Sequence, residues 1–249
     1  MPNRRELDAD YQAKVLRKDA EELWARWQKW FPLLTNYVSD LYHRMEIYKD
    51  LVEVVKANTE TLKPPVLYNW LRDNYVVAES MAIRRLLDVE ERSVSLGRLL
   101  REIELRPELV TKLRYRELMR EKMSQQDADA SFDRIMGGPA VQIASAIATA
   151  DIARLEAAEE NIRKLVNKRF AHAAPFTQVA QFDVFEEIEH AIEELDQVVV
   201  KYDSLIYGGG LSTAHAAKLY WKQPLEIAWI QNTPRSEVPR YEGPAHRKL

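Results

Sequence analysis

Residues 24–48 read WARWQKWFPLLTNYVSDLYHRMEIY, and this stretch indicates the fold class. Its apolar side chains recur at steps of three and four residues, the spacing that places side chains on one face of an α-helix. The residues of this stripe are Trp24, Trp27, Phe31, Leu34, Val38, Leu41, Met45 and Tyr48. The stripe predicts one long amphipathic helix from Asp8 to about Val55, kinked or split at Pro32 because proline removes a helical hydrogen bond.

The rest of the chain repeats this helical spacing and shows almost no alternation of apolar and polar residues, so we predict an all-α protein. Further helices are expected over residues 64–88, 96–103, 107–122, 139–173 and 182–207, with 124–135 as either a small helix or an ordered loop. We expect a single helical bundle with a long kinked N-terminal helix over residues 1–230, followed by a flexible C-terminal tail at 231–249. Residues 211–230 give no clear pattern.

Composition excludes several classes of protein. The 249-residue chain contains no cysteine, which excludes disulfides, thiol catalysis and cysteine-ligated metal sites. Its formal net charge is -3, so any contact with nucleic acid must rest on a local basic patch. The segment Met1 to Ala20 lacks the apolar centre of a signal peptide, and no window is long enough to span a bilayer. We therefore expect a cytoplasmic protein with no membrane partner.

Known cofactor and metal signatures are missing from the sequence. It has no phosphate-binding glycine loop, no dinucleotide fingerprint, no paired-histidine zinc motif and no serine elbow. Glu187 and His190 form one Glu-x-x-His arrangement, but di-iron bundles carry this arrangement on two helices. A solvated acidic helix face is the favoured interpretation. The sequence predicts no cofactor and no bound metal.

Two clusters have both a structural and a functional interpretation. Trp24, Trp27 and Trp30 suit a stacking platform for nucleic-acid bases. Core packing is favoured, because Trp24 and Trp27 share a helix face with apolar neighbours. Arg85 and Asp88 are three residues apart, so we expect them to form an ion pair on one helix face.

A single histidine is the candidate catalytic residue. His172 follows the polar, basic turn that begins at Asn167, near the predicted end of a long helix. The ordinary pKa of histidine lies near neutrality, which suits general acid–base catalysis on a phosphodiester. Cations at the end of a helix also complement the helix dipole, so the local sequence leaves both interpretations open.

Three segments, taken in order, resemble the AbiU type of the HEPN superfamily, which are abortive-infection proteins of prokaryotes. They are 82–88 (AIRRLLD), 92–100 (RSVSLGRLL) and 167–172 (NKRFAH), and the resemblance covers about residues 37–207. It implies an all-α bundle that dimerises and a metal-independent endoribonuclease site where two copies of the motif helix meet. The implied partners are RNA, a second copy of the chain, and a cognate antitoxin or regulatory protein. We expect the helix at 139–173 near the dimer interface, because its small residues permit close approach.

The motif of this family is an arginine, then a polar residue, with a histidine four to six positions beyond the arginine. His172 matches the histidine and Asn167 the polar residue, but Val166 occupies the place of the arginine. Arg169 and Lys168 lie three and four residues before His172, on the same helix face.

The resemblance then implies one role for each matching residue. His172 is the general acid and base, Asn167 orients the phosphate or the histidine, and Arg169 with Lys168 stabilises the charged intermediate. Because lysine and valine replace arginine poorly, the alternative is a catalytically silent dimeric module that binds RNA or a partner protein. A purely structural helical protein is a third interpretation, favoured by the slightly acidic charge.

Overall fold

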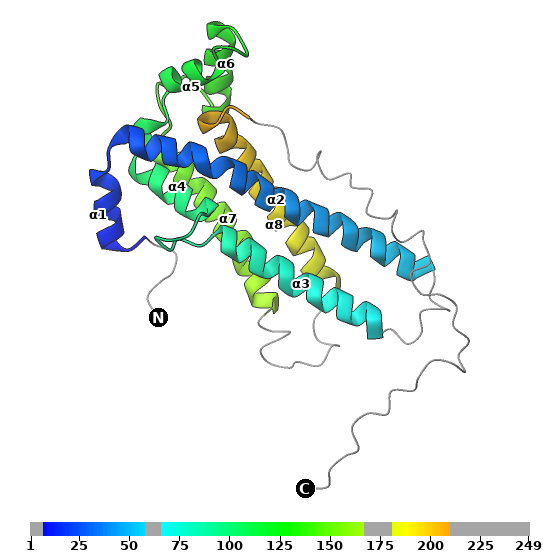
Figure 1. Cartoon of the computed structure of the whole chain (residues 1–249). Coiled ribbons are helices and arrows are strands. Elements are labelled where there is room, and N and C mark those ends of the chain that lie inside the picture. The colour runs from blue at the N-terminus through cyan, green and yellow to red at the C-terminus, as the bar shows by residue number, and fades with distance from the viewer. Residues whose placement is uncertain (1–6, 58–65, 167–180, 210–249) are drawn as a thin grey trace, which may run out of the picture. The chain divides into compact units, whose positions relative to one another are not determined.

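The computed structural model describes residues 7–57, 66–166 and 181–209, which form helices and no strand within these ranges (Figure 1). This confirms the all-α prediction. The helices are α1 (Ala9–Arg17), α2 (Ala20–Ala57), α3 (Val66–Leu86), α4 (Leu96–Leu105), the 3-10 helix η1 (Pro107–Leu109), α5 (Lys112–Met119), α6 (Gln125–Met136), α7 (Ser145–Val166) and α8 (Gln181–Ile206). All of them belong to one compact unit, Met1–Lys218. The predicted tail lies outside the described residues.

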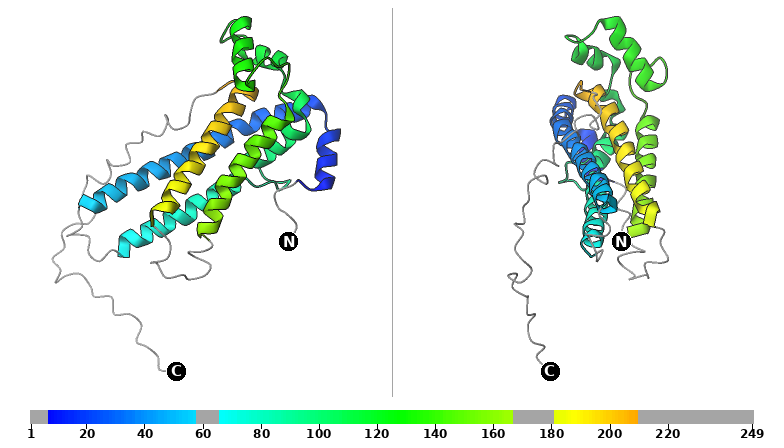
Figure 2. Two further views of the ribbon diagram at one scale, coloured as in Figure 1. Left: turned by 180° about the vertical axis from the view of Figure 1, so that it is seen from behind. Right: turned by 90° about the vertical axis from the view of Figure 1, so that its right-hand side faces the viewer.

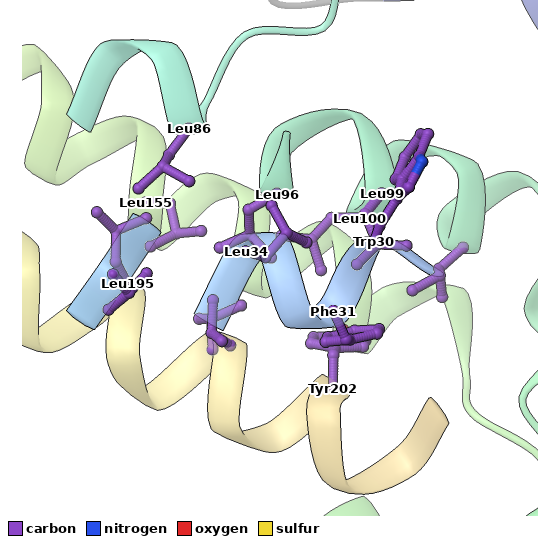
Figure 3. Close-up of a cluster of buried hydrophobic side chains, with 14 of the residues drawn as sticks. Trp30, Phe31, Leu34, Leu86, Leu96, Leu99, Leu100, Leu155, Leu195 and Tyr202 are labelled. Carbon is purple, nitrogen blue, oxygen red and sulfur yellow. The ribbon is translucent and has the colours of Figure 1, made fainter. Parts of the chain in front are cut away.

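The core forms where α2, α4, α7 and α8 pack together, with α3 against α2, α7 and α8 (Figure 2). Figure 3 shows leucine and aromatic side chains from these helices meeting at the centre. Each buried side chain of this size contributes about 1.5–3 kcal/mol, so this layer dominates the stability of the bundle. The labelled members are Trp30, Phe31, Leu34, Leu86, Leu96, Leu99, Leu100, Leu155, Leu195 and Tyr202.

The long N-terminal helix is divided at Lys18, not at Pro32 as expected. Lys18 is extended (φ -65°, ψ 145°), and Asp19 starts α2 by accepting hydrogen bonds from the amides of Glu21 and Glu22 at 2.9 and 3.1 Å. Pro32 is exposed within α2, where water can reach the carbonyl that proline leaves unpaired. The overlooked signal was Asp19 followed by acidic residues, a typical helix start.

The region expected to form one helix over 107–122 contains η1 and α5 as separate pieces. Thr111 is extended and caps α5, because its hydroxyl accepts a hydrogen bond from the amide of Arg114 at 3.2 Å. The amide of the preceding Val110 closes η1 by donating to the carbonyl of Pro107 at 3.1 Å, and its carbonyl accepts from the amide of Ile143 at 2.9 Å. Backbone pairing with a distant segment therefore ends the helix here.

The same pairing corrects the expected start of the helix at Pro139. The Lys112 amide donates to the carbonyl of Val141 at 2.9 Å, which keeps this segment extended, and α7 begins at Ser145. The end expected for this helix, at Ala173, lies outside the described residues. Of the two interpretations of 124–135, the helix is confirmed as α6, which Gly137 ends with a left-handed φ of 77°.

Candidate functional site

The predicted catalytic residues follow the last described turn of α7. Val166, which stands in the place of the motif arginine, is the final residue of α7 as described. Asn167, Lys168, Arg169 and His172 lie outside the described residues, so their assignment stays a prediction. The structure describes the frame of this site, which consists of the end of α7, the start of α8 and the helices packed against both.

The two helices that flank the candidate segment form an antiparallel pair. Near the end of α7, Asn161 donates to the carboxylate of Glu187 in the first half of α8 at 3.1 Å. Near the start of α7, Asp151 accepts a hydrogen bond from the hydroxyl of Tyr202, late in α8, at 2.9 Å. Contacts at both ends of the pair fix the points where the chain leaves α7 and enters α8.

Stacked aromatic rings support the start of α8. The ring of Tyr48 from α2 lies 4.1 Å from that of Tyr75 from α3 and 5.0 Å from that of Phe185, with centroid distances in each case. Burial, the largest effect, raises the pKa of both tyrosine hydroxyls, so they stay neutral phenols in the physiological range. The stack ties three helices together at the end of the bundle where α7 stops.

Buried charges lie on the same part of α3. Glu79 is fully buried and accepts hydrogen bonds from Arg44 of α2, one of them from Nη2 at 3.3 Å. Desolvation raises the pKa of Glu79 above its ordinary value of 4.5, while the hydrogen bond from Arg44 opposes that shift. Arg72 is only 2% exposed and pairs with Asp73 at 3.1 Å. These residues were not expected from the sequence, although Arg72 and Glu79, seven residues apart, place two charges on the inner face of α3.

The tryptophan cluster is part of the core. Trp24, Trp27 and Trp30 are 9%, 0% and 7% exposed, which confirms core packing over a stacking platform. An indole that is covered on both faces cannot stack on a nucleic-acid base.

The Glu-x-x-His arrangement on α8 is engaged in surface contacts. Glu189 pairs with Lys49 of α2, and Glu187 accepts the hydrogen bond from Asn161, while His190 is exposed. Within the described ranges, no group of three or more histidine, aspartate or glutamate side chains is placed to hold a metal ion. These contacts agree with a solvated acidic face.

The first two segments of the family resemblance, 82–88 and 92–100, meet at the junction between α3 and α4. Ser95 caps α4 by accepting a hydrogen bond from the amide of Arg98 at 3.3 Å. Its hydroxyl also donates to the carbonyl of Asp88 after the end of α3. Ser95 therefore ties the start of α4 to the residues that follow α3.

Gly97 allows these two helices to approach closely. A Cβ atom on Gly97 would lie 2.5 Å from the carbonyl oxygen of Leu87 and 2.8 Å from its carbonyl carbon. Because the contact is with backbone, no side chain can move aside to make room. Any larger residue must push α4 away from the end of α3.

A buried polar network lies behind this junction and joins α1, α2 and α4. Arg98 donates from Nε to Glu102 at 3.0 Å and to the hydroxyl of Tyr11 at 2.8 Å. The other carboxylate oxygen of Glu102 accepts from Arg26 at 2.5 Å and from the indole of Trp27 at 2.7 Å. Burial is the largest effect that raises the pKa of Tyr11 to about 12, so its phenol stays protonated.

The expected ion pair between Arg85 and Asp88 does not form. The guanidinium of Arg85 lies over the ring of Tyr37 of α2, 5.1 Å from its centroid. Asp88 accepts a hydrogen bond from the amide of Glu90 at 3.2 Å, because α3 has already ended. At this junction Ser95, Gly97 and Arg98 make internal structural contacts. The segment after α7 remains the predicted site.

The sequence of the chain matches a known protein family. The AbiU2 model of the HEPN group matches residues 25–223, which is most of the chain. The chain belongs to the AbiU2 family. The matched range includes both segments at the α3–α4 junction of this AbiU2 protein and the segment that contains His172. This membership confirms the resemblance seen in the sequence and indicates a defence function of the abortive-infection type.

Comparisons with curated proteins and with solved structures found no match to this AbiU2 protein. In the ranges that the structure describes, none of its helices combines the length and the apolar character needed to cross a membrane.

Proposed function

We propose that this AbiU2 protein acts in abortive-infection defence as a metal-independent endoribonuclease that works as a homodimer. The observation that carries the proposal is the family match, because it includes the segment with Asn167 and His172. Contacts between α7 and α8 fix the described ends of the two helices that flank this segment.

In the proposed reaction, His172 takes the proton of a ribose 2′-hydroxyl while that oxygen attacks the neighbouring phosphorus. The bond from phosphorus to the 5′-oxygen breaks, and the partner's His172 donates a proton to this leaving oxygen. The products are a 2′,3′-cyclic phosphate and a 5′-hydroxyl. Asn167 orients the phosphate or the histidine, and Arg169 with Lys168 stabilises the charge that develops on the phosphoryl oxygens.

Val166 favours a second candidate function, a catalytically silent module that binds RNA or a partner protein as a dimer. Valine cannot neutralise a phosphate, and lysine lacks the planar fork with which arginine contacts it. We therefore expect slow cleavage by the wild-type protein.

Cleavage of labelled RNA without added metal, and with EDTA, tests the proposal. We expect His172→Ala to remove activity and Arg169→Ala to lower it by at least ~10²-fold, the low end for a positioned proton-transfer or charge-stabilising group. His190→Ala is the matched control, because His190 is exposed on α8 and should leave the rate unchanged. Val166→Arg should raise the rate by restoring a guanidinium beside Asn167.

Three results would decide against parts of the proposal. Robust cleavage that survives His172→Ala rejects the site. Cleavage that EDTA abolishes and magnesium restores rejects metal independence. Absence of cleavage by the wild-type protein, with RNA affinity that His172→Ala leaves intact, supports the binding module.

A further inference from the structure

Helix α3 is apolar on two faces. Its inner face packs in the core through Val76 and Ile83. Its outer face exposes Trp70, Val77 and Met81, which are 61%, 41% and 60% exposed. At ~100° per residue these three side chains lie within about 40° of one another, so they form one stripe, which the exposed Asn74 interrupts between Trp70 and Val77. Large apolar side chains that gather in this way indicate a surface that binds a protein partner.

We propose that a second copy of the chain covers this outer α3 stripe, with the two α3 helices antiparallel across a two-fold axis at Val77. The inference rests on the proposed function, since it states where the homodimer forms.

The residues of the stripe complement themselves in this register. Residues equally far before and after Val77 face each other across such an axis, and Trp70 and Arg84 are each seven residues away from it. Trp70 therefore faces the partner's Arg84, and a guanidinium over an indole ring is an attractive pair. A parallel arrangement would instead place Arg84 opposite the partner's Arg84, which is repulsive.

Along the bundle, the stripe lies near the described end of α7 and the start of α8, which flank the candidate segment. The ring of Tyr75, two residues before Val77, lies 6.2 Å from that of Phe185 of α8. Two residues further along α8, Glu187 contacts Asn161 of α7. From Asn161 to the end of α7 the helix rises only ~8 Å, at 1.5 Å per residue.

An exposed surface of small residues on α7 fits a shared site less well than the α3 stripe does. Its alanines are Ala146, Ala150, Ala153 and Ala157, all exposed. An axis at Ala153 would lie ~20 Å along the helix from Val166, at 1.5 Å per residue. An antiparallel contact there would place the two copies of Val166 on opposite sides of that axis, each ~20 Å from it along the helix.

The absence of cysteine makes a disulfide test clean. Packed helices have axes 8–10 Å apart and Cα atoms about 2.3 Å from each axis, so two Cα atoms at the two-fold axis approach to ~3–5 Å. This range overlaps the ~4.4–6.8 Å span of a disulfide. We expect Val77→Cys in the full chain to form a covalent dimer under mild oxidation. Val141→Cys is the matched control, because Val141 is 81% exposed and lies away from α3.

The register is tested by exchanging the two facing residues. We expect Trp70→Lys and Arg84→Glu each to weaken self-association about tenfold, as loss of a cation–π pair and a new unfavourable pair would do. The double variant should recover most of the loss, because the introduced lysine faces the introduced glutamate of the partner. A double variant that is weaker than either single variant overturns the antiparallel register.

A chain that stays monomeric at every concentration, with no more cross-linking by Val77→Cys than by Val141→Cys, overturns the proposal and leaves the stripe to RNA or another protein. The proposed function fails separately. His172→Ala should leave the Val77→Cys cross-link unchanged, and a cross-linked dimer that cleaves no RNA supports the interface while rejecting the ribonuclease. Cleavage by a strictly monomeric protein overturns the interface, and it also overturns the proposed reaction, which needs the partner's His172.

Discussion

Glu102 and Glu79 are both fully buried carboxylates in one helical bundle, yet they have very different surroundings. Glu102 accepts hydrogen bonds from donors on three helices, including Arg98 at 3.0 Å and Trp27 at 2.7 Å. Within the described ranges Glu79 accepts from Arg44 alone, and the side chain of Arg44 is 40% exposed.

The difference shows that a buried carboxylate holds several helices together only when its hydrogen-bond donors come from separate helices. Each donor to Glu102 belongs to an element that must already be in place, so the network holds α1, α2 and α4 in one arrangement. Glu79 has one partner at the edge of solvent, and desolvation is its largest influence, which raises its pKa. We therefore expect the Glu102 network to respond strongly to mutation and the Glu79 pair to respond to pH.

The largest effect should come from breaking the Glu102 network at Arg98. We expect Arg98→Met to lower the free energy of unfolding by about 3–5 kcal/mol, because it removes one of the two arginines that pair with buried Glu102 and the donor to the carbonyls of Glu91 and Ser93. Chemical denaturation measured by circular dichroism checks this. Arg92→Met, at an exposed arginine of the same segment, should change stability by less than about 0.5 kcal/mol. Equal effects of the two variants would mean that the network contributes little.

The junction that places Arg98 should be nearly as sensitive. Gly97→Ala puts a methyl group against the Leu87 backbone, so we expect a loss of about 1–3 kcal/mol, as for other overpacked sites. The control is Gly138→Ala, where a Cβ atom meets nothing within 4 Å. A tolerated alanine at position 97 would show that α3 and α4 can separate at little cost.

The Glu79 pair should show a pH-dependent effect of intermediate size. We expect Arg44→Met to lower stability by about 1–2 kcal/mol at pH 8, since it leaves a buried acceptor without its donor. Without Arg44 the folded-state pKa of Glu79 lies further above 4.5, so the folded state binds a proton more readily than the unfolded chain. The loss should then shrink as pH falls toward 5. A loss that is constant from pH 8 to 5 would contradict this account.

The smallest effect should come from a peripheral donor of the Glu102 network. We expect Tyr11→Phe to lower stability by about 1 kcal/mol at pH 7, the value of one hydrogen bond. The Tyr11 phenol ionises near 10.0 when unfolded and at about 12 when folded, so wild-type stability falls between these pH values. Denaturation at pH 7 and 11 should therefore show the advantage of tyrosine shrinking as pH rises.

Signals close to each other along the chain predicted the helices well. The expected ranges 96–103 and 182–207 lie close to α4 and α8, because Ser95 caps the start of α4 and Gly208, with a left-handed φ of 83°, follows the end of α8. Prediction failed where distant segments pair. The expected helix over 107–122 is divided because Val110 and Lys112 bond to residues about thirty positions away. Nothing next to these residues in the sequence carries that information.

For the candidate site, the sequence by itself predicts which residues carry the chemistry, and its match to the AbiU2 model shows the family. A motif is a pattern of residues at fixed spacing along the chain. The sequence alone therefore identifies His172, Asn167 and the unexpected Val166 as the motif positions. Their catalytic roles stay predictions, since proton transfer depends on distances that spacing along the chain does not set.

The tertiary structure alone decided what the other charged and apolar residues do. Glu79 and Glu102 look alike in sequence, but in the described part of the chain Glu102 accepts from three donors on distant helices and from Arg98 of its own helix, whereas Glu79 accepts from Arg44 alone. Trp27 and Trp70 also look alike, yet one is buried and the other is exposed on the outer α3 stripe. The physical reason is that burial and hydrogen-bond partners arise from helices that meet only when the whole bundle is assembled.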